Sequence, residues 1–475
     1  MLDIFDFCRK DEDYAIHRAI HCIWDWKTSL NSWEWHLVVH VCRRWRELVF
    51  ASPHRLNLRI PCTSRTPVDL GVWPALPIDV DDHDLLSDTA QEDNILATLK
   101  HVDRVYHVRL SLSDSQVEKM ATAMQEPFPV LTRLFLTLPW HNYHDIPSLP
   151  ANFLGGSAPR LQAIVLYGIP YPALPTLLLS TSDLIKLDLR NVPFAGSISS
   201  EAIVASLAVL PKLEIFVIEF RWRGSTLRIG PPPVTRTILT LPSLSYFVFR
   251  GASEYLEDLV GRIDGPRLGH ISITTYWPVG FQVAELSRFI DHSVGPKVAQ
   301  CRHAEVHFLD HSVTFNLFHR PDDFGQDRTT ILSYEGIGWE DTQVLRQLPV
   351  TLSNVVHLQI TCGLILEYSP TDNPVPVGLS VQLFQLIPQF SAMQTLLVDS
   401  QLSAFVASIL GHIPEVMMTE ALPYLELLCL EEYCQHSVQL DKFVAARRHS
   451  DHPVTIVNTK KEFREILDSY ISKNE

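Results

Sequence analysis

The sequence predicts an α/β fold in which one strand and one helix alternate along most of the chain as a solenoid. A strand signature, apolar-x-x-apolar-x-apolar, recurs from near Val105 to near Leu430, with starts 23 to 38 residues apart and one gap of 52 residues. Helical patterns lie between the signatures. A repeat this short cannot bury its apolar face alone, so neighbouring repeats must stack. The alternation therefore predicts a parallel sheet along one side and helices along the other.

The strands are predicted where the signature occurs, with weaker copies from His303 onward. The gap between His303 and Val355 leaves room for one degenerate copy. We expect parallel strands centred near residues 108, 134, 164, 187, 216, 247, 271, 306, 358, 396 and 428.

The helices are predicted from apolar residues that recur at helical spacing after a polar start. In residues 113–125, for example, Ser113 precedes an apolar face that contains Val117, Met120 and Met124. Residues 223–236 and 321–328 are expected to be loop insertions, and residues 460–471 a closing helix, because terminal repeats need a polar outer face. The remaining helices are expected at residues 199–210, 253–263, 282–292, 340–348, 379–387 and 401–413.

The first hundred residues differ in character from the repeats. Residues 1–60 hold five of the ten tryptophans and an amphipathic helix that ends before Pro53, because proline disfavours helix at the preceding residue. Residues 79–93 carry seven acidic residues and no lysine or arginine, which indicates a solvated linker or loop. We therefore predict a small helical segment over 1–60, a linker with an acidic stretch over 61–101, and the solenoid over 102–475.

Composition limits the classes of partner and the cell compartment. Lysine and arginine number 39 against 54 acidic residues, a net charge of −15, which argues against a binder of nucleic-acid backbone. Prolines interrupt the two longest uncharged stretches, 161–182 and 373–398, so we predict no membrane span. The eight cysteines are scattered without a C-x-x-C pair, and the start resembles no signal peptide. We expect a cytoplasmic or nuclear protein with reduced thiols.

The sequence contains no recognisable catalytic or metal-binding motif. Phosphate-binding, zinc-protease, nucleophile-elbow and calcium-loop patterns are all missing. His141 and His144 form the best metal-like cluster, but no second ligand pair lies at zinc-like spacing, so surface or packed histidines are the better interpretation. Carboxylates are plentiful, yet a single sequence does not pair them in space. We predict no enzyme, no cofactor and no metal site, and an enzyme with an unrecognised site on a loop is the weaker alternative.

The N-terminal helix resembles the core of an F-box. Residues 37–46 read LVVHVCRRWR, in which Val41, Cys42 and Trp45 match the F-box pattern V-C-[RK]-x-W. Residues 2–5 resemble the earlier L-x-x-I-F segment. The runs 50–59, 73–78 and 94–105 are similar to the large F-box families of mushroom-forming fungi, whose F-box is followed by leucine-rich-like repeats. Because Met1 falls just before Leu2, the first F-box helix is expected to be truncated.

This resemblance implies a non-catalytic substrate receptor of a cullin-RING (SCF-type) ubiquitin ligase. The F-box would bind a Skp-type adaptor and through it a cullin, while the leucine-rich-repeat-like solenoid captures a protein substrate, with the chain a monomer within that complex. The alternative is a ligase-independent repeat scaffold whose F-box is degenerate or clipped. The residues that the resemblance assigns to adaptor binding are Leu2, Ile4, Phe5, Val38, Val41, Cys42, Trp45 and Leu48.

The strand signature also predicts which side chains face a partner. Alternation along a strand sends the signature residues into the core and those between them to the opposite, open face of the sheet. Arginine and tyrosine often dominate protein interfaces, so the cations and aromatics of this face are predicted to bind an acidic or phosphorylated segment, although a merely solvated sheet face carries similar residues. The predicted residues are Arg109, Arg133, Phe135, Tyr167, Lys186, Arg190, Tyr246 and Arg250.

Overall fold

The computed structural model divides into two compact units, Met1–Arg223 and Gly224–Glu475. It describes residues 40–51, 59–63, 75–82, 89–138, 147–193, 198–221, 237–276, 283–309, 312–318, 330–337, 352–363, 383, 385–412, 422–431, 438–449 and 452–458.

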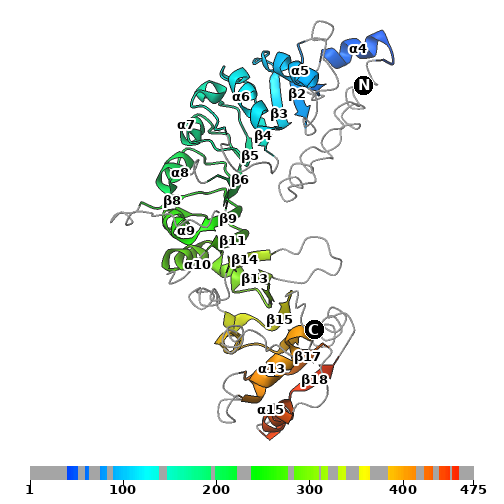
Figure 1. Cartoon of the computed structure of the whole chain (residues 1–475), viewed down its shortest axis with the longest axis vertical. Helices are drawn as coiled ribbons and strands as arrows, with labels where there is room; N and C mark the ends of the chain where they lie inside the picture. Colours follow the sequence, from blue (N-terminus) through cyan, green and yellow to red (C-terminus); the bar gives the residue numbers. More distant parts are fainter. Residues whose placement is uncertain are drawn as a thin grey trace. The chain divides into compact units, whose positions relative to one another are not determined.

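The first unit is α/β, and its strands pair in parallel in the order of the chain (Figure 1). The strands are β1 (Ile60–Cys62), β2 (Ile78–Asp82), β3 (Val105–Ser111), β4 (Arg133–Thr137), β5 (Ala163–Tyr167), β6 (Lys186–Val192) and β7 (Ile215–Phe220). The helices are α4 (Arg43–Phe50), α5 (Thr89–Leu99), α6 (Asp114–Ala123), η2 (Phe153–Gly156), α7 (Leu174–Leu178) and α8 (Ser200–Leu207). In Figure 1, α6, α7 and α8 lie along one side of the strands.

The core of the first unit is made of the signature residues. Leu134 on β4, Ile164 on β5 and Leu187 on β6 are aligned in register, and each is at most 1% exposed. The residues that precede them on β4 and β5, Arg133 and Ala163, are aligned on the other face and are only partly buried. The period-two alternation therefore places the core as the sequence predicts.

The predicted linker over 61–101 is wrong where the structure describes it. Strand β2 pairs in parallel with β1 on one side and β3 on the other, and Asp79 and Asp82 are only 7% and 5% exposed. Helix α5 follows, and Ile95 and Leu99 on it are fully buried. The acidic residues conceal an alternation in which Ile78 and Val80 face the core. Among the described residues the sheet begins at Ile60, before the predicted start of the solenoid at residue 102.

The second unit is also α/β and mostly parallel. Its strands are β8 (Leu239–Thr240), β9 (Tyr246–Ala252), β10 (Ile263–Asp264), β11 (His270–Tyr276), β12 (His303–Phe308), β13 (Ser312–Phe318), β14 (Thr330–Ile337), β15 (His357–Cys362), β16 (Thr395–Val398), β17 (Leu427–Leu430) and β18 (Thr455–Asn458). Its helices are α9 (Ser253–Val260), α10 (Ala284–Val298), η5 (Leu352–Asn354), η6 (Ile387–Gln389), α13 (Ser400–His412) and α15 (Val438–His449). Strands β8 and β10 form a separate parallel pair.

The long gap in the repeat pattern contains a meander rather than one degenerate repeat. Strand β13 pairs antiparallel with both β12 and β14, and β14 pairs in parallel with β11. The local strand order is therefore β11-β14-β13-β12-β15, which reverses the order of the chain. A hairpin can join adjacent antiparallel strands directly, so this insertion needs no crossover helix.

The last repeats bury both faces of their strands. All four residues of β16 and all four of β17 are buried. Leu397, Leu427 and Cys429 form an apolar cluster on the face that is polar in earlier strands, and Val457 packs against it. The expectation that one sheet face stays open is therefore wrong for β16 and β17. Their continuous apolar sequences are typical of strands that are buried on both faces.

Most of the predicted elements are confirmed. All eleven predicted strand centres fall within β3 to β7, β9, β11, β12, β15, β16 and β17. Among the predicted helices, 113–125, 199–210, 253–263, 282–292 and 401–413 correspond to α6, α8, α9, α10 and α13. The predictions for 223–236, 321–328, 340–348 and 460–471 lie outside the described residues. No helix in the described part is long and apolar enough to cross a membrane.

Two adjacent glycines in η2 allow a matched test of backbone geometry. Gly155 and Gly156 have φ values of +61° and +69°, which favour glycine. A Cβ on Gly155 would lie 2.7 Å from Pro127, whereas one on Gly156 would meet no atom within 4 Å. We expect Gly156→Ala to lose about 1–2 kcal/mol from the left-handed backbone alone, and Gly155→Ala to lose more. Urea unfolding of both variants measures the difference; equal losses would contradict the contact with Pro127.

Candidate functional site

The described part of the F-box-like segment is the single helix α4. Its N-cap is Cys42, whose Sγ accepts a hydrogen bond from the backbone N–H of Trp45 at 3.4 Å. Val41 is 60% exposed, Trp45 and Leu48 are partly buried, and Val49 is buried. Leu2, Ile4, Phe5 and Val38 lie outside the described residues, so an adaptor-binding surface stays a prediction.

The predicted substrate-binding residues fall into both units. Arg109, Arg133, Phe135, Tyr167, Lys186 and Arg190 lie on β3 to β6 of the first unit, and Tyr246 and Arg250 lie on β9 of the second. In the first unit the register aligns Arg109 with Phe135, and Tyr167 with Arg190. These six residues therefore share one sheet face, as alternation predicts.

Acidic side chains on the same face bind most of these cations. Asp188 forms ion pairs with Lys186 at 3.4 Å and with Arg190 at 2.8 Å. Arg190 forms a second ion pair, with Glu219 at 3.3 Å. The side chain of Asp188 is 3% exposed, against 15% for Lys186 and 13% for Arg190. The carboxylate thus lies beneath the two cations and holds them in place. The face is a network of paired charges rather than an unbroken basic surface.

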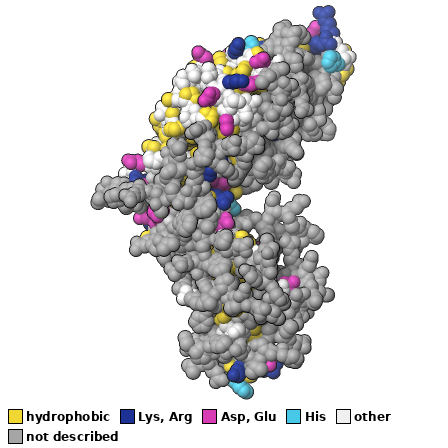
Figure 2. Space-filling view, viewed as in Figure 1, with side chains coloured by type: hydrophobic (Ala, Val, Ile, Leu, Met, Phe, Trp, Pro, Cys, Tyr) yellow, Lys and Arg dark blue, Asp and Glu magenta, His cyan; other side chains and the backbone are white. Residues whose placement is uncertain are grey.

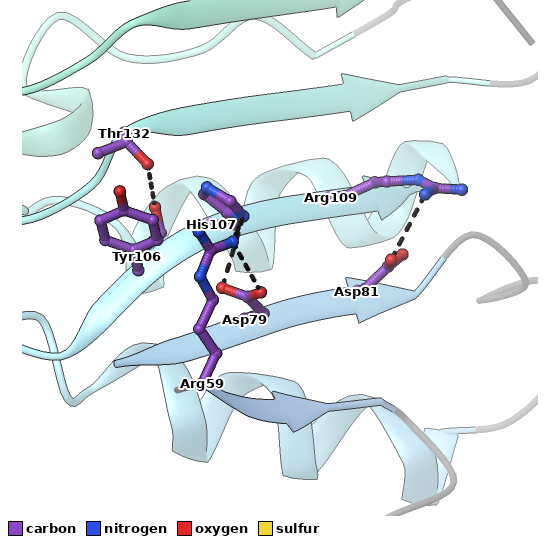
Figure 3. Close-up of polar contacts among 7 residues, drawn as sticks. All are labelled: Arg59, Asp79, Asp81, Tyr106, His107, Arg109 and Thr132. Carbon is purple, nitrogen blue, oxygen red and sulfur yellow. Dashed lines mark hydrogen bonds and ion pairs between the residues drawn. The ribbon is translucent and has the colours of Figure 1, made fainter. Parts of the chain in front are cut away.

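A cluster of polar side chains in the first unit lies where β1, β2 and β3 meet (Figure 3). Arg59, just before β1, contacts Asp79 at 3.3 Å, and the guanidinium also lies 4.6 Å from the centre of the Tyr106 ring. Two residues further along β2 and β3, Arg109 contacts Asp81 at 3.4 Å. In Figure 3 the carboxylate of Asp79 points toward both Arg59 and His107. The sequence prediction missed this cluster because it assigned Asp79 and Asp81 to a solvated linker.

The protonation of His107 follows from its partners. Arg59 Nη1 lies 3.0 Å from His107 Nδ1. Asp79 Oδ1 also faces Nδ1, at the longer distance of 3.5 Å. A guanidinium only donates, so the closer contact with Arg59 assigns Nδ1 as the acceptor and places the proton of the neutral imidazole on Nε2. Burial lowers the pKa of His107 well below its usual value, and the guanidinium groups of Arg59 and Arg133 lower it further. Nε2 is itself buried without a hydrogen-bond partner, so the cluster is built around a neutral histidine.

This neutral histidine should make the fold sensitive to mild acid. The folded pKa of His107 lies below the unfolded value of about 6.5, so the unfolded chain binds the extra proton first as the pH falls. The stability contributed by neutral His107 is therefore present above pH 6.5 and lost below it. Burial lowers the pKa of His357 to about 4, with Arg302 as a further cause, so that residue adds a loss between pH 6.5 and 4.

We expect the urea midpoint of the double variant His107→Gln, His357→Gln to fall less than that of the native chain between pH 7.5 and pH 5. His101→Gln, which changes an exposed histidine, is the control and should follow the native curve. Parallel curves for the native chain and the double variant would contradict the assignment of neutral, buried histidines.

The second unit carries a different kind of sheet face. Tyr246 stacks on His270 with ring centres 4.4 Å apart, and Arg250 lies over the ring of Tyr276 at 5.7 Å. Further along, Thr274 donates a hydrogen bond to Glu335 at 3.2 Å. The contacts on this face are thus ring stacking, a cation–π contact and a hydroxyl–carboxylate hydrogen bond.

Neither face of the described structure assembles a metal centre. Within the described ranges, no group of three or more histidine, cysteine or acidic side chains is placed to hold a metal ion. On the described part of the first unit that Figure 2 shows, basic and acidic side chains are interspersed.

Comparison with known protein families and curated proteins finds no match. No family model matches the chain, and no curated protein matches it.

Proposed function

We propose that this protein is the substrate-recognition subunit of a cullin-RING ubiquitin ligase, with a leucine-rich-repeat-like solenoid that captures a protein substrate. The observation that supports it most is the run of parallel strands in register, β3 to β6, which presents a polar face beside a helix-covered core. Stacked repeats of this kind form extended binding surfaces. Such a receptor performs no step of ubiquitin transfer; it raises the effective concentration of its substrate near the ligase.

The adaptor contact is proposed for the N-terminal segment that contains α4. Val41 is an apolar side chain exposed to 60% at the start of this helix. An exposed valine beside the partly buried Trp45 is consistent with a surface that a Skp-type adaptor covers. The finer assignment of Leu2, Ile4, Phe5 and Val38 to the same surface rests on the F-box resemblance alone.

The substrate contact is proposed for the face of β3 to β6 in the first unit. Lys186 and Arg190 lie above the carboxylate of Asp188, so a partner meets the cations before it meets the acid. Ala163 and Val165 are short, uncharged side chains on β5, and Ala163 lies between the long side chains of Arg133 on β4 and Lys186 on β6. We propose that an acidic segment lies along β5, where it accepts charge-assisted hydrogen bonds from both sides.

The adaptor proposal is tested by co-purification of the full chain with a Skp-type adaptor. We expect Val41→Glu to abolish binding, because a charge would enter an apolar interface. Leu179→Glu is the matched control, since Leu179 is also an apolar residue of the first unit and is 59% exposed. If the native chain binds no adaptor, or if both variants bind equally well, the ligase-independent scaffold becomes the better account.

The substrate proposal is tested on an array of acidic, phosphorylated and neutral peptides. The double variant Arg133→Gln, Lys186→Gln should lose binding to acidic peptides, whereas Lys212→Gln, which changes an exposed lysine paired with Asp183, should not. An unchanged peptide profile in the folded double variant would remove this face from the proposal and leave the adaptor contact untouched.

A further inference from the structure

Three side chains on the sheet face of the second unit form a continuous hydrogen-bond chain. Thr361 on β15 and His307 on β12 are direct neighbours in the register of two parallel strands. His307 Nδ1 is hydrogen-bonded to Thr361 Oγ1. His307 Nε2 lies 3.4 Å from Glu305 Oε2, two residues earlier on the same strand. The sequence alone could not show this, because Thr361 and His307 are 54 residues apart.

The partners of the imidazole decide where its proton lies. An ionised carboxylate only accepts hydrogen bonds, so the Nε2 that faces Glu305 carries the hydrogen. In the neutral ring Nδ1 is then the acceptor, and Thr361 must donate its hydroxyl proton to it. This order of hydroxyl, imidazole and carboxylate is the arrangement by which a general base activates a nucleophile.

Along this hydrogen-bond chain, the carboxylate is the more buried group and the imidazole the more exposed one, as such activation needs. The side chain of Glu305 is 7% exposed, whereas that of His307 is 36% exposed. The carboxylate is therefore shielded, where it can stabilise an imidazolium, and the base is open to a reagent. Thr361 is partly buried on the same face.

We propose that Thr361 is an activated hydroxyl that accepts an acyl group from a reactive ester. In this step Thr361 Oγ forms a bond to the acyl carbon and the bond from that carbon to the leaving oxygen breaks. The hydroxyl proton passes to His307 Nδ1 and then to the leaving oxygen, so no other reagent is consumed. Glu305 holds the imidazole and balances its charge while it carries the proton.

The surroundings of Thr361 favour a short acyl group. Gln359 and Asn316 lie opposite Glu305 on the two neighbouring strands, and Thr314 lies opposite His307. These side chains are polar, and the apolar Leu309, which is 39% exposed, lies beside Gly363, two residues after Thr361, so a short acyl group suits this mixed surface better than a long one. The N–H of Cys362 donates to Asp399 Oδ2, and β15 is paired with β12 and β16 on its two sides. The side-chain amide of Gln359, two residues before Thr361 on the same face, is therefore the donor that we assign to the carbonyl oxygen.

The test is acetylation of the full chain by p-nitrophenyl acetate, followed by mass spectrometry of the threonine-containing peptides. We expect Thr361 to be acetylated at least about a hundredfold faster than Thr314 or Thr274, since a positioned general base contributes about 10²–10⁴ in rate. Thr361→Ser should react faster than the native chain, because a primary hydroxyl is less hindered. Thr361→Val should remove the label, and His307→Gln and Glu305→Gln should slow it.

The matched controls are Thr314→Val, which changes the hydroxyl on the other side of the same imidazole, and Thr274→Val, which changes a hydroxyl bound to Glu335 without an imidazole. Both should leave labelling of Thr361 unchanged. Equal labelling of Thr361 and Thr314 in the native chain would overturn the proposal, and this comparison needs no variant to fold. Undiminished labelling in a folded His307→Gln chain would overturn it as well. The outcome is independent of adaptor binding.

Discussion

Replacement of Asp79 with alanine should lower the free energy of unfolding by about 3–5 kcal/mol, the cost of leaving a buried charge without its partner. The side chains of Arg59 and Asp79 are 9% and 10% exposed, and their closest atoms are 3.3 Å apart. Without the carboxylate, the guanidinium of Arg59 would face the neutral ring of His107 and the ring of Tyr106. Urea unfolding at pH 7.5 measures the change.

The control for this prediction is Asp183→Ala. Asp183 pairs with Lys212 at 2.6 Å, but the two side chains are 46% and 62% exposed. Exposed pairs contribute about 0–1 kcal/mol, so the control should unfold almost as the native chain does. Equal losses in the two variants would show that Arg59 reaches solvent and that β1 and β2 are not a buried part of the sheet.

Phe247→Ala should have an effect of similar size, about 3–5 kcal/mol, because it empties a large aromatic site in the core. Phe247 lies at the middle position of the signature on β9 and is fully buried. Its ring meets that of Phe289 on α10 edge-on, with centres 5.7 Å apart. The loss would therefore weaken the contact between a strand and the helix that covers it. Denaturant unfolding and near-ultraviolet circular dichroism both report it.

The matched control is Val248→Ala, at the next residue on the same strand. Val248 faces the other side of the sheet and is partly exposed, so its truncation should cost much less. If Val248→Ala destabilised the chain as much as Phe247→Ala, the assignment of core and open faces in the second unit would be inverted.

The sequence predicts those strands whose apolar residues alternate plainly. Leu134 and Leu136, or Ile271 and Ile273, are separated by one residue that faces away from the core, and their strands are confirmed. The prediction fails where burial involves charge. Ile78 and Val80 alternate equally well, but the aspartates between and after them conceal the strand, since burial of Asp79 depends on Arg59, a distant residue. The meander was missed because pairing direction is not encoded in alternation.

The same limit applies to the sites. Alternation assigns Arg109, Lys186 and Arg190 to a common face, but it cannot show which carboxylates reach them. Asp188 pairs with two of these cations from within its own strand. Thr361 meets His307 only because β15 lies beside β12, and that neighbourhood depends on the reversed strand order. Contacts across strands need the register, which requires the folded structure.

The reversed strand order has a consequence for how the second unit folds. Ordinary neighbours in the array are close in the chain: Phe247 and Ile271 pair across 24 residues. Ile271 and Leu332 pair across 61 residues, because the chain runs from β11 to β12 first and then returns through β13 to β14, which lies beside β11. Stacked repeats can fold by adding one unit to the next, but here the chain must first close a longer loop, at an entropic cost that rises by about 0.6 kcal/mol for each doubling of loop length. We therefore expect the pairing of β14 with β11 to form more slowly than the pairing of β9 with β11.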